Sequence, residues 1–404
     1  MATSVEYPGR PPLLANALHR SLISLLHVER RFDPFFRPFL DTLAQEPIAG
    51  LVQAAINAQR PNDNLALAQE LALPDEHAIV QQIIERMGAY MREQYQPGTF
   101  QRAGNTKTHG VLRAEFQVHG DIPPNLRHGI FSAPRSYPAW VRLAGPGPDS
   151  PPDIEDVGVL SIGIKVMRVP GPKLLDDERF TQDFTGISTP TFTTPNIIEN
   201  AKLQAAVLRR TPLFYFINPF DSHLLDGVMQ GLWARTQSSP LQTSYWSCVP
   251  YLLGAGQAVQ YAFRPRSRET SAIPGLPGRP NDNYLREAMI RTLAERPVDF
   301  DVFVQVQTDP HRMPIENASV RWPEHLSTPI RIATLHFPEQ QFASPAQLAF
   351  AGQLSINPWH CLAEHRPLGN QNRARLAIYK TLSALRQSMN STPHVEPTGD
   401  EVFE

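Results

Sequence analysis

Apolar side chains recur at helical spacing through the first hundred residues of the chain. The first stripe falls on Leu14, Leu18, Leu22, Leu25 and Leu26. A second stripe falls on Ile79, Val80, Ile83, Ile84 and Met87. We therefore predict that residues 1–100 form a helical N-terminal extension. Its first stripe either touches a membrane surface or packs on the parent domain, and the poor cationic face of the stripe favours packing.

Beyond residue 110 the pattern becomes a strict alternation of apolar and polar positions. Alternating runs lie at 112–118, 160–166, 257–264, 299–307 and 328–337. They predict half-buried antiparallel strands that form a barrel or a sandwich with an interior large enough for a ligand. Helical spacing returns at 196–210, 221–236, 283–295, 345–354 and 371–389. We predict an α+β domain over residues 101–390 and a loose polar tail over residues 391–404.

The composition is that of a large globular protein. The chain has 404 residues, a formal net charge of -2 and 41% hydrophobic residues, and its 40 prolines favour strands joined by long ordered connections. The near-neutral charge and the lack of a basic run argue against a nucleic-acid partner. No apolar run approaches the ~20 residues of a membrane span. The two cysteines, Cys248 and Cys361, are expected to be free thiols of a cytoplasmic protein.

One face of the last predicted helix combines a tyrosine with two arginines. Arg375 precedes Tyr379 by four residues and Arg386 follows it by seven, so the three side chains share a stripe. Positive charge one turn away favours the ionised phenolate. A phenolate binds ferric iron, and tyrosine is the haem ligand of catalases. The alternative, which the spacing alone favours, is a surface helix with two solvated arginines and a half-buried tyrosine.

A histidine stands at the entrance of the first predicted strand. His109 lies between Thr108 and Gly110 and directly precedes the alternating run. A histidine there can point into a cavity, and with a pKa near neutrality it can shuttle a proton to and from a substrate. The commoner alternative is a hydrogen-bonded structural histidine.

Four blocks of the sequence, taken in order, resemble the haem-dependent catalase superfamily. They lie at 108–116, 139–143, 183–192 and 357–386. Their most specific parts are Thr108-His109-Gly110, Trp140-Val141-Arg142, Gly186-Ile187-Ser188-Thr189-Pro190 and Asn357-Pro358-Trp359-His360. The chain looks most similar to the small catalase-related branch of bacteria that also occurs fused to lipoxygenases in corals. A shared order of motifs is more specific than any one of them.

The resemblance implies a catalase-type antiparallel β-barrel with surrounding helices, and a haem b group with ferric iron. It makes Tyr379 the axial phenolate on the iron and Arg375 the residue that holds this phenolate. It pairs Arg142 and Arg386 with the haem propionates, for which guanidinium groups are well shaped. His109 becomes the acid and base on the opposite, distal side, while the block at 183–192 becomes a distal-side loop.

The chain departs from true catalases on the distal side. Thr108 replaces the valine before the histidine, as in coral allene oxide synthases, and its hydroxyl is a candidate hydrogen-bond donor near the haem. Ile187 and Ser188 stand where catalases carry an asparagine, so only the Ser188 hydroxyl is left to act there. Ala144 replaces the serine that supports the distal histidine. These changes remove donors that would orient hydrogen peroxide.

The resemblance with these departures predicts an enzyme for organic hydroperoxides, those of fatty acids above all. It would act as a peroxidase or as an isomerase or lyase like allene oxide synthase. A weak catalase and a haem- or lipid-binding protein without turnover are the alternatives. The expected partners that remain open are a membrane surface, contacted peripherally through the N-terminal helices, and a second copy of the chain in a homodimer. His360 and His365 superficially suggest a metal site, but their proline-rich loop favours structural roles.

Overall fold

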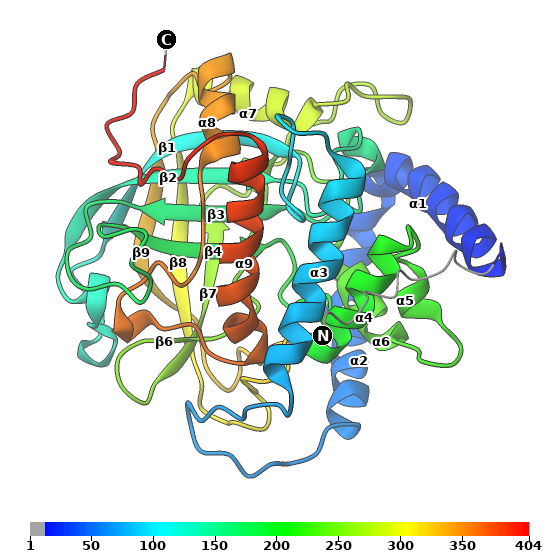
Figure 1. Cartoon of the computed structure of the whole chain (residues 1–404), viewed down its shortest axis with the longest axis horizontal. Coiled ribbons are helices and arrows are strands. Elements are labelled where there is room, and N and C mark those ends of the chain that lie inside the picture. The colour runs from blue at the N-terminus through cyan, green and yellow to red at the C-terminus, as the bar shows by residue number, and fades with distance from the viewer. Residues whose placement is uncertain (1–12, 404) are drawn as a thin grey trace.

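An antiparallel sheet that closes on itself forms the centre of the molecule (Figure 1). The computed structural model describes residues 13–403. Its strands run in the order β5-β4-β3-β2-β1-β9-β8-β7, and a β5–β7 pairing completes an eight-stranded barrel whose β7 also pairs with β6. The strands are β1 (Thr108–Val118), β2 (Arg135–Ala144), β3 (Ser161–Val166), β4 (Gln182–Ile187), β5 (Tyr245–Trp246), β6 (Tyr251–Leu252), β7 (Ala258–Pro265), β8 (Val298–Val306) and β9 (Ile330–Phe337).

The alternating runs place one set of side chains inside this barrel. On β1, Leu112, Ala114 and Phe116 are buried in the main hydrophobic cluster, whereas Arg113 and Glu115 are exposed. The interior is filled by aromatic rings, among them a stacked pair whose centroids lie 5.6 Å apart, Phe116 and Phe184. The prediction of a barrel is confirmed. The predicted ligand-sized interior is wrong, because large side chains from several strands meet at the barrel axis.

Helices surround the barrel and account for the predicted N-terminal extension. They are α1 (Leu13–Leu40), α2 (Glu46–Ala58), α3 (Glu76–Gln94), α4 (Ile197–Leu208), α5 (Phe214–Ile217), α6 (Leu224–Trp233), α7 (Tyr284–Glu295), α8 (Pro345–Gln353) and α9 (Asn370–Met389). A π-helical turn, η1 (Asp41–Gln45), joins α1 to α2. Short 3-10 turns are η2 (Pro124–Leu126), η3 (Gly129–Phe131), η4 (Asp153–Glu155), η5 (Pro240–Gln242) and η6 (Ala363–His365). Within the described residues, the helices are all too short or too polar to cross a membrane.

Helix α9, which carries the Arg375–Tyr379–Arg386 stripe, lies across the outside of strands β1 to β4, with α3 beside it (Figure 1). The two helices share a hydrophobic cluster to which Ile83 of α3 and Ile378 of α9 belong. The start of α9 is held by Arg373, whose guanidinium lies 2.7 Å from Glu70 and 2.8 Å from Glu76. The N-terminal extension therefore fixes the helix on which the tyrosine is carried.

The C-terminal tail follows the barrel wall. Arg113 of β1 donates to the carbonyl of Gly399 at 3.0 Å, and the indole of Trp140 donates to Glu401 at 2.6 Å. Phe403 packs edge-on against Trp140 with 5.7 Å between ring centroids. The prediction of a loose tail is therefore wrong, because the polar tail ends in side chains that bond to two neighbouring strands.

Candidate functional site

His109 occupies a β-bulge at the start of β1. Thr108 pairs with Ala144 and Gly110 pairs with Leu143, so the histidine is the extra residue between two regular pairs. A bulge of this kind re-aims one side chain and is common beside active sites. A side chain at position 110 would place its Cβ 2.6 Å from Phe342, which explains the glycine there.

The backbone of the bulge is held from outside by α7. Arg286 donates to the carbonyl of His109 at 2.9 Å and to the carbonyl of Thr108 at 2.6 Å. One guanidinium thus bonds to the carbonyls of two successive residues at the bulge. The direction of the histidine side chain is thus fixed before any ligand is considered.

The His109 ring is buried, at 1% exposed, among positive charges. Burial, followed by Lys107, Arg286 and Arg142, lowers the pKa of His109 to about 3. The near-neutral pKa expected from the sequence is therefore wrong for the protein without a ligand, and the imidazole is neutral at pH 7. Its Nε2 is buried and makes no hydrogen bond to any described residue, so it is free to accept a proton.

A carboxylate that the sequence did not indicate stands behind the histidine. Asp153 Oδ1 lies 3.7 Å from Nδ1 of His109 and 2.7 Å from the ammonium of Lys107. Ala144, where the resemblance would place a supporting serine, offers no side-chain acceptor. The nearest acceptor for the Nδ1 side thus comes from η4, a turn after the second strand.

Thr108 and Arg142 are brought together. The threonine hydroxyl accepts from Arg142 at 3.1 Å through Nε and at 2.7 Å through Nη2. The same Nη2 donates to the carbonyls of Asn105 at 2.8 Å and Thr106 at 3.1 Å. Both lone-pair directions of the hydroxyl thus face the arginine, and Thr108 orients Arg142.

Three arginines form a positive cluster that no acidic group in the described part of the chain neutralises. Burial, followed by Arg386, lowers the pKa of Arg142 to about 9, and burial lowers the pKa of Arg386 to about 10. The pKa of Arg102 is lowered well below its usual range by burial, then by Arg142 and Arg386. Arg102 donates to the carbonyl of Ala351 at 3.0 Å, and Nη2 of Arg386 is buried with no hydrogen-bond partner among the described residues. The cluster therefore has the charge and open donors of an anion site.

Arg375 and Tyr379 are bonded to each other, as their spacing on α9 predicts. The Tyr379 hydroxyl accepts from Nη2 of Arg375 at 2.9 Å and from Nε at 3.1 Å. Arg375 also donates to Thr185 of β4 at 2.6 Å and to Asn372 at 3.0 Å. Two guanidinium donors are thus aimed at one phenolic oxygen.

Cross-strand register links the two halves of the site. Arg142 lies opposite Gly163, and Gly163 lies opposite Thr185. Residues directly opposite one another point to the same face of a sheet. Arg142, near the histidine, and Thr185, bonded to Arg375, thus share the outer face of the barrel, over which α9 lies.

The remaining distal candidates are turned toward the backbone or are apolar. The Ser188 hydroxyl is buried and accepts from the amide of Leu160 at 2.8 Å. Ile187, the last residue of β4, is partly exposed on the same face as Thr185. The segment that the resemblance makes a loop thus begins as a strand, because residues 182–187 pair with β3.

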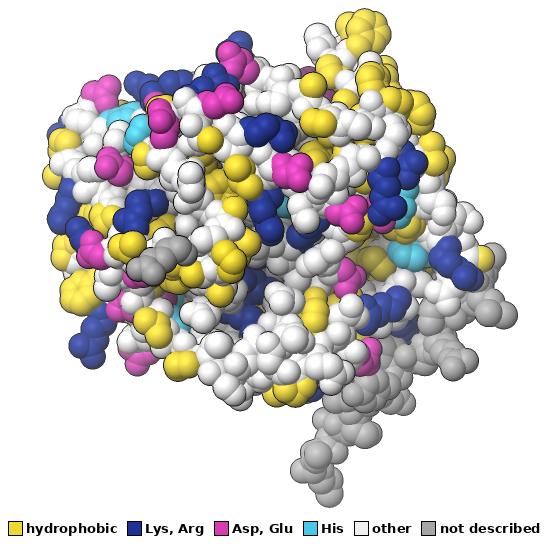
Figure 2. Space-filling model, turned by 90° about the horizontal axis from the view of Figure 1, so that it is seen from above, with side chains coloured by type: hydrophobic (Ala, Val, Ile, Leu, Met, Phe, Trp, Pro, Cys, Tyr) yellow, Lys and Arg dark blue, Asp and Glu magenta, His cyan; other side chains and the backbone are white. Residues whose placement is uncertain are grey.

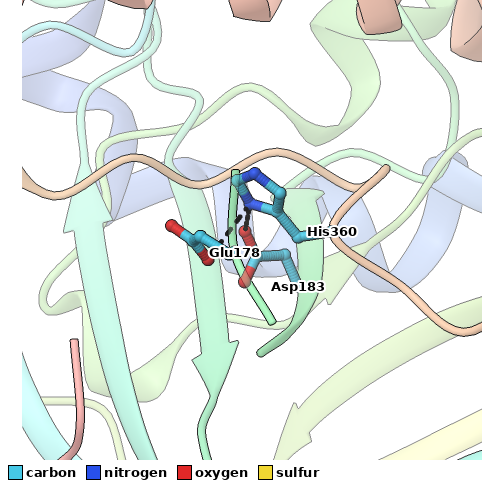
Figure 3. A group of neighbouring side chains, drawn as sticks. All are labelled: Glu178, Asp183 and His360. Carbon is cyan, nitrogen blue, oxygen red and sulfur yellow. Dashed lines mark hydrogen bonds and ion pairs between the residues drawn. The ribbon is translucent and has the colours of Figure 1, made fainter. Parts of the chain in front are cut away.

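His360 belongs to a separate buried ionic cluster (Figure 3). Its Nδ1 lies 2.9 Å from Asp183 and 3.3 Å from Glu178, and its Nε2 lies 3.1 Å from Asp177. Burial and Lys165 lower the pKa of His360, but its hydrogen bonds to Asp177 and Asp183 outweigh both and raise this pKa to about 9. The Lys165 ammonium lies 2.8 Å from Asp183 and also bonds to Glu178. An ammonium between the two carboxylates takes the place of a metal ion, so the cluster ties the loop before α9 to β3 and β4.

His365 lies elsewhere, beneath the turn η3. Its Nε2 accepts from the amide of Ile130 at 3.1 Å, and its ring meets Phe131 edge-on. Burial lowers its pKa to about 3. The two histidines of this loop therefore have separate structural contacts and do not share a metal site.

Comparisons with solved structures agree with this architecture. Catalase A from Saccharomyces cerevisiae superposes with a TM-score of 0.57 at 13% identity, over 86% of this chain and 73% of the catalase. A fungal catalase gives 0.56 at 14% identity over 86% and 70%, and a bacterial catalase gives 0.52 at 14% over 83% and 67%. The chain has the catalase fold. No protein-family description and no curated protein sequence matches it.

The sequence predicted the residues that form the main contacts of the site, but it did not predict the residues that hold them in position. Lys107, Asp153 and Arg286 position the histidine, while Arg102 and Thr185 complete the arginine cluster and the Arg375 contact. Arg102 and Asp153 stand in irregular segments, where no periodic pattern marks a residue. Thr185 could have been found, because it alternates with buried neighbours on a strand that the resemblance already covers.

Proposed function

We propose that this protein is a haem-dependent enzyme that acts on organic hydroperoxides, with those of fatty acids as its preferred substrates. The observation that carries the proposal is the arginine cluster of Arg102, Arg142 and Arg386. It offers buried cations and an unused donor to an anionic ligand, on the barrel face over which Tyr379 is held. That the solved neighbours are catalases supports a haem-dependent reaction.

The residues present fit a haem group. Its two propionates carry the negative charge that the cluster lacks, and Arg142 and Arg386 would hold them. Tyr379 would bind the iron through its phenolic oxygen, to which Arg375 donates two hydrogen bonds. Bound haem would supply the iron centre at which the O–O bond of a hydroperoxide breaks.

His109 would move the proton in this reaction. Its Nε2 is neutral and has no hydrogen-bond partner among the described residues, so it would accept the proton of the hydroperoxide and later return it to the departing oxygen. Asp153, 3.7 Å from Nδ1, stabilises the imidazolium while the proton is held. The bulge and Arg286 keep the ring in place without using its nitrogens.

The choice of substrate follows from what stands beside the histidine. The Thr108 hydroxyl is bonded to Arg142, Ser188 is bonded to the backbone, and Ile187 and Ala144 bring no polar group. Few donors are left to orient a second hydrogen peroxide, which a catalase needs. An apolar wall instead favours a substrate with a hydrocarbon chain.

An optical spectrum of the purified protein tests the haem assignment, and paired assays test the substrate. We expect a ferric haem spectrum, rapid consumption of a fatty-acid hydroperoxide and slow dismutation of hydrogen peroxide. Product analysis separates a peroxidase, which leaves an alcohol, from an isomerase or lyase, which leaves an epoxide or cleaved aldehydes. Dismutation as fast as in catalases would refute the substrate assignment, and a haem-loaded protein inert toward both substrates would leave only a binding role.

A further inference from the structure

Helices α1 and α2 with the turn η1 between them turn an apolar face to solvent. On this continuous helical stretch, six large side chains spaced by three or four residues are about half exposed or more. Their exposed fractions are Leu25 65%, Val28 56%, Phe32 49%, Phe35 64%, Phe39 69% and Leu43 61%. This spacing puts all six on one side of the helix. Hydrophobic side chains gather along the right-hand edge in Figure 2, the side on which α1 lies in Figure 1.

The polar side chains of α1 point the other way, into the protein. Arg30 is 6% exposed and donates to the carbonyl of Val157 at 2.6 Å, and Asp33 is 1% exposed and accepts from the amide of Thr236. Arg37 donates to the carbonyl of Leu232 at 2.7 Å. The helix is therefore attached by its polar side, and packing among the described residues does not explain its apolar side. An exposed apolar face of this size marks a binding surface.

The charges next to the face favour a lipid surface. Each acidic group along the face lies beside an arginine. Asp33 is buried, and Asp41 lies 2.9 Å from Arg37 and is largely buried. The more exposed Glu29 lies 3.8 Å from Arg30, and Glu46 lies 2.7 Å from Arg321. Arg20, in contrast, is exposed and Arg31 is partly exposed. Apolar side chains with flanking arginines suit the boundary between lipid headgroups and acyl chains.

The shape of the face argues against a paired helix from a second copy. A coiled-coil seam is narrow, with one exposed apolar residue at each contact. Here neighbours in the sequence are exposed together, Phe35 with Phe36 and Phe39 with Leu40. Pro34 and Pro38 stand inside the helix beside this wide part. The face is broad and aromatic, as a helix lying in a membrane surface requires.

We propose that the exposed face of α1 and η1, from Leu25 to Leu43, binds the surface of a lipid bilayer. The segment that α1 holds through Arg30 lies next to η4, whose Asp153 stands beside His109. The lipid-facing helix is thus connected by a short series of contacts to the distal side of the candidate site. Delivery of a lipid hydroperoxide from the bilayer rests on the proposed function, whereas lipid binding itself does not.

Vesicle co-sedimentation of the full chain tests the proposal. The probe is vesicles of phosphatidylcholine mixed with phosphatidylglycerol, and the variant is Phe35→Glu with Phe39→Glu. The two phenylalanines are the most exposed aromatic residues of the face, so the change leaves the core intact. We expect the parent protein to bind and the variant to bind at least about tenfold more weakly, since two buried aromatic side chains are lost from the lipid contact.

The matched control replaces two exposed apolar residues on the C-terminal side, Phe180→Glu with Val402→Glu. These are 59% and 84% exposed, and Phe180 lies beside the C-terminal tail through its bond to Glu396. The control variant should bind vesicles as the parent does. No binding by the parent, or equal loss in both variants, would overturn the proposal.

Sedimentation velocity tests whether a second copy of the chain covers the face instead. If the parent is a dimer and only the Phe35→Glu with Phe39→Glu variant is a monomer, the face belongs to a dimer contact and the lipid proposal is overturned. Haem content and turnover without lipid are measured on the same samples. These two measurements test the proposed function, whereas vesicle binding tests only the lipid contact, so either proposal can fail without the other.

Discussion

Removing a buried charge from the arginine cluster should increase the stability of the haem-free protein, whereas most substitutions of buried residues decrease stability. In the haem-free protein, Arg386 is 5% exposed, its Nη2 lacks a partner among the described residues, and burial lowers its pKa to about 10. Replacing it by methionine, which has a similar length and no charge, should stabilise the haem-free fold while weakening the binding of an anionic ligand.

The magnitude follows from the pKa. The lowering of the Arg386 pKa to about 10, at roughly 1.4 kcal/mol per pKa unit, corresponds to a cost of about 3 kcal/mol for keeping Arg386 charged. Because the folded pKa lies below the unfolded one, the cost is fully present below pH 10 and disappears as the pH rises toward the pKa of the unfolded chain. At neutral pH, Arg386→Met should therefore raise the free energy of unfolding by about 1–3 kcal/mol.

A matched substitution on the same helix should do the opposite. Arg373 lies 2.7 Å from Glu70, 2.8 Å from Glu76 and 3.1 Å from Glu316. Arg373→Met removes these charge-assisted bonds from three partly buried carboxylates, which should cost about 2 kcal/mol. The two variants thus separate an unsatisfied cation from a satisfied one.

Urea unfolding of protein made without haem, followed by tryptophan fluorescence, measures both changes. Haem titration of the same samples should show binding at least about tenfold weaker for Arg386→Met, since one charged partner of a propionate is lost. If the haem-free Arg386→Met protein were less stable than the parent, the cluster would not be an unpaired anion site and the argument for haem would lose its basis.

Three further substitutions test the roles of His109, Tyr379 and the buried His365. His109→Gln should keep haem, as judged by the optical spectrum, but lower turnover of an organic hydroperoxide by about 10²–10⁴-fold; unchanged turnover would remove His109 from the reaction. Tyr379→Phe deletes the oxygen that Arg375 holds, so haem content should fall or the spectrum should shift; full loading with an unaltered spectrum would exclude the tyrosine as ligand. His365 is buried and neutral with a pKa of about 3, so the unfolded chain binds a proton below pH 6.5 that the folded chain does not, and stability falls as the pH drops. At pH 5 this costs about 2 kcal/mol, and His365→Gln, which can still accept from Ile130, should reduce the loss of stability between pH 7 and pH 5; an unchanged pH dependence would contradict the assignment.

The parts of the fold that the sequence predicted are those with a local period. Strands β1, β3, β7, β8 and β9 and the helices from α4 to α9 with a clear apolar face lie within a few residues of their predicted ranges. The contact between Arg375 and Tyr379 was predicted for the same reason, since a four-residue spacing on a helix fixes two side chains relative to each other.

Which face of each helix or strand packs against the rest of the protein was harder to predict. On β2, residues 139–144 are all buried because helices and the tail cover the outer face of the barrel, so alternation does not mark the inside. The apolar stripe at the start of α1 was expected to pack on the domain. Leu22 and Leu26 are partly buried as expected, but Leu25 is 65% exposed and the polar residues further along the helix face inward. Periodicity shows that a helix has two faces and does not show which one binds.

The supports of the site were beyond any local pattern because each depends on a contact between distant segments. Lys107 and Asp153 are separated along the chain by two strands and are brought near each other only when β1 pairs with β2. Arg102 is held by the carbonyl of Ala351, which follows from the position of α8 on the barrel. Such residues carry no period and no motif, and their role is visible only from the charges around them.

The same charges connect ligand binding to the chemistry of His109. Burial is the main cause of its low pKa, but Arg142 contributes to it, and Arg142 is one of the arginines that an anionic ligand would neutralise. Neutralising Arg142 removes part of the repulsion that opposes protonation of the imidazole. The pKa of His109 should therefore rise when the cluster is occupied, so that the histidine becomes a better proton acceptor only in the loaded protein. Binding of the anionic group and activation of the base are then two effects of one electrostatic change.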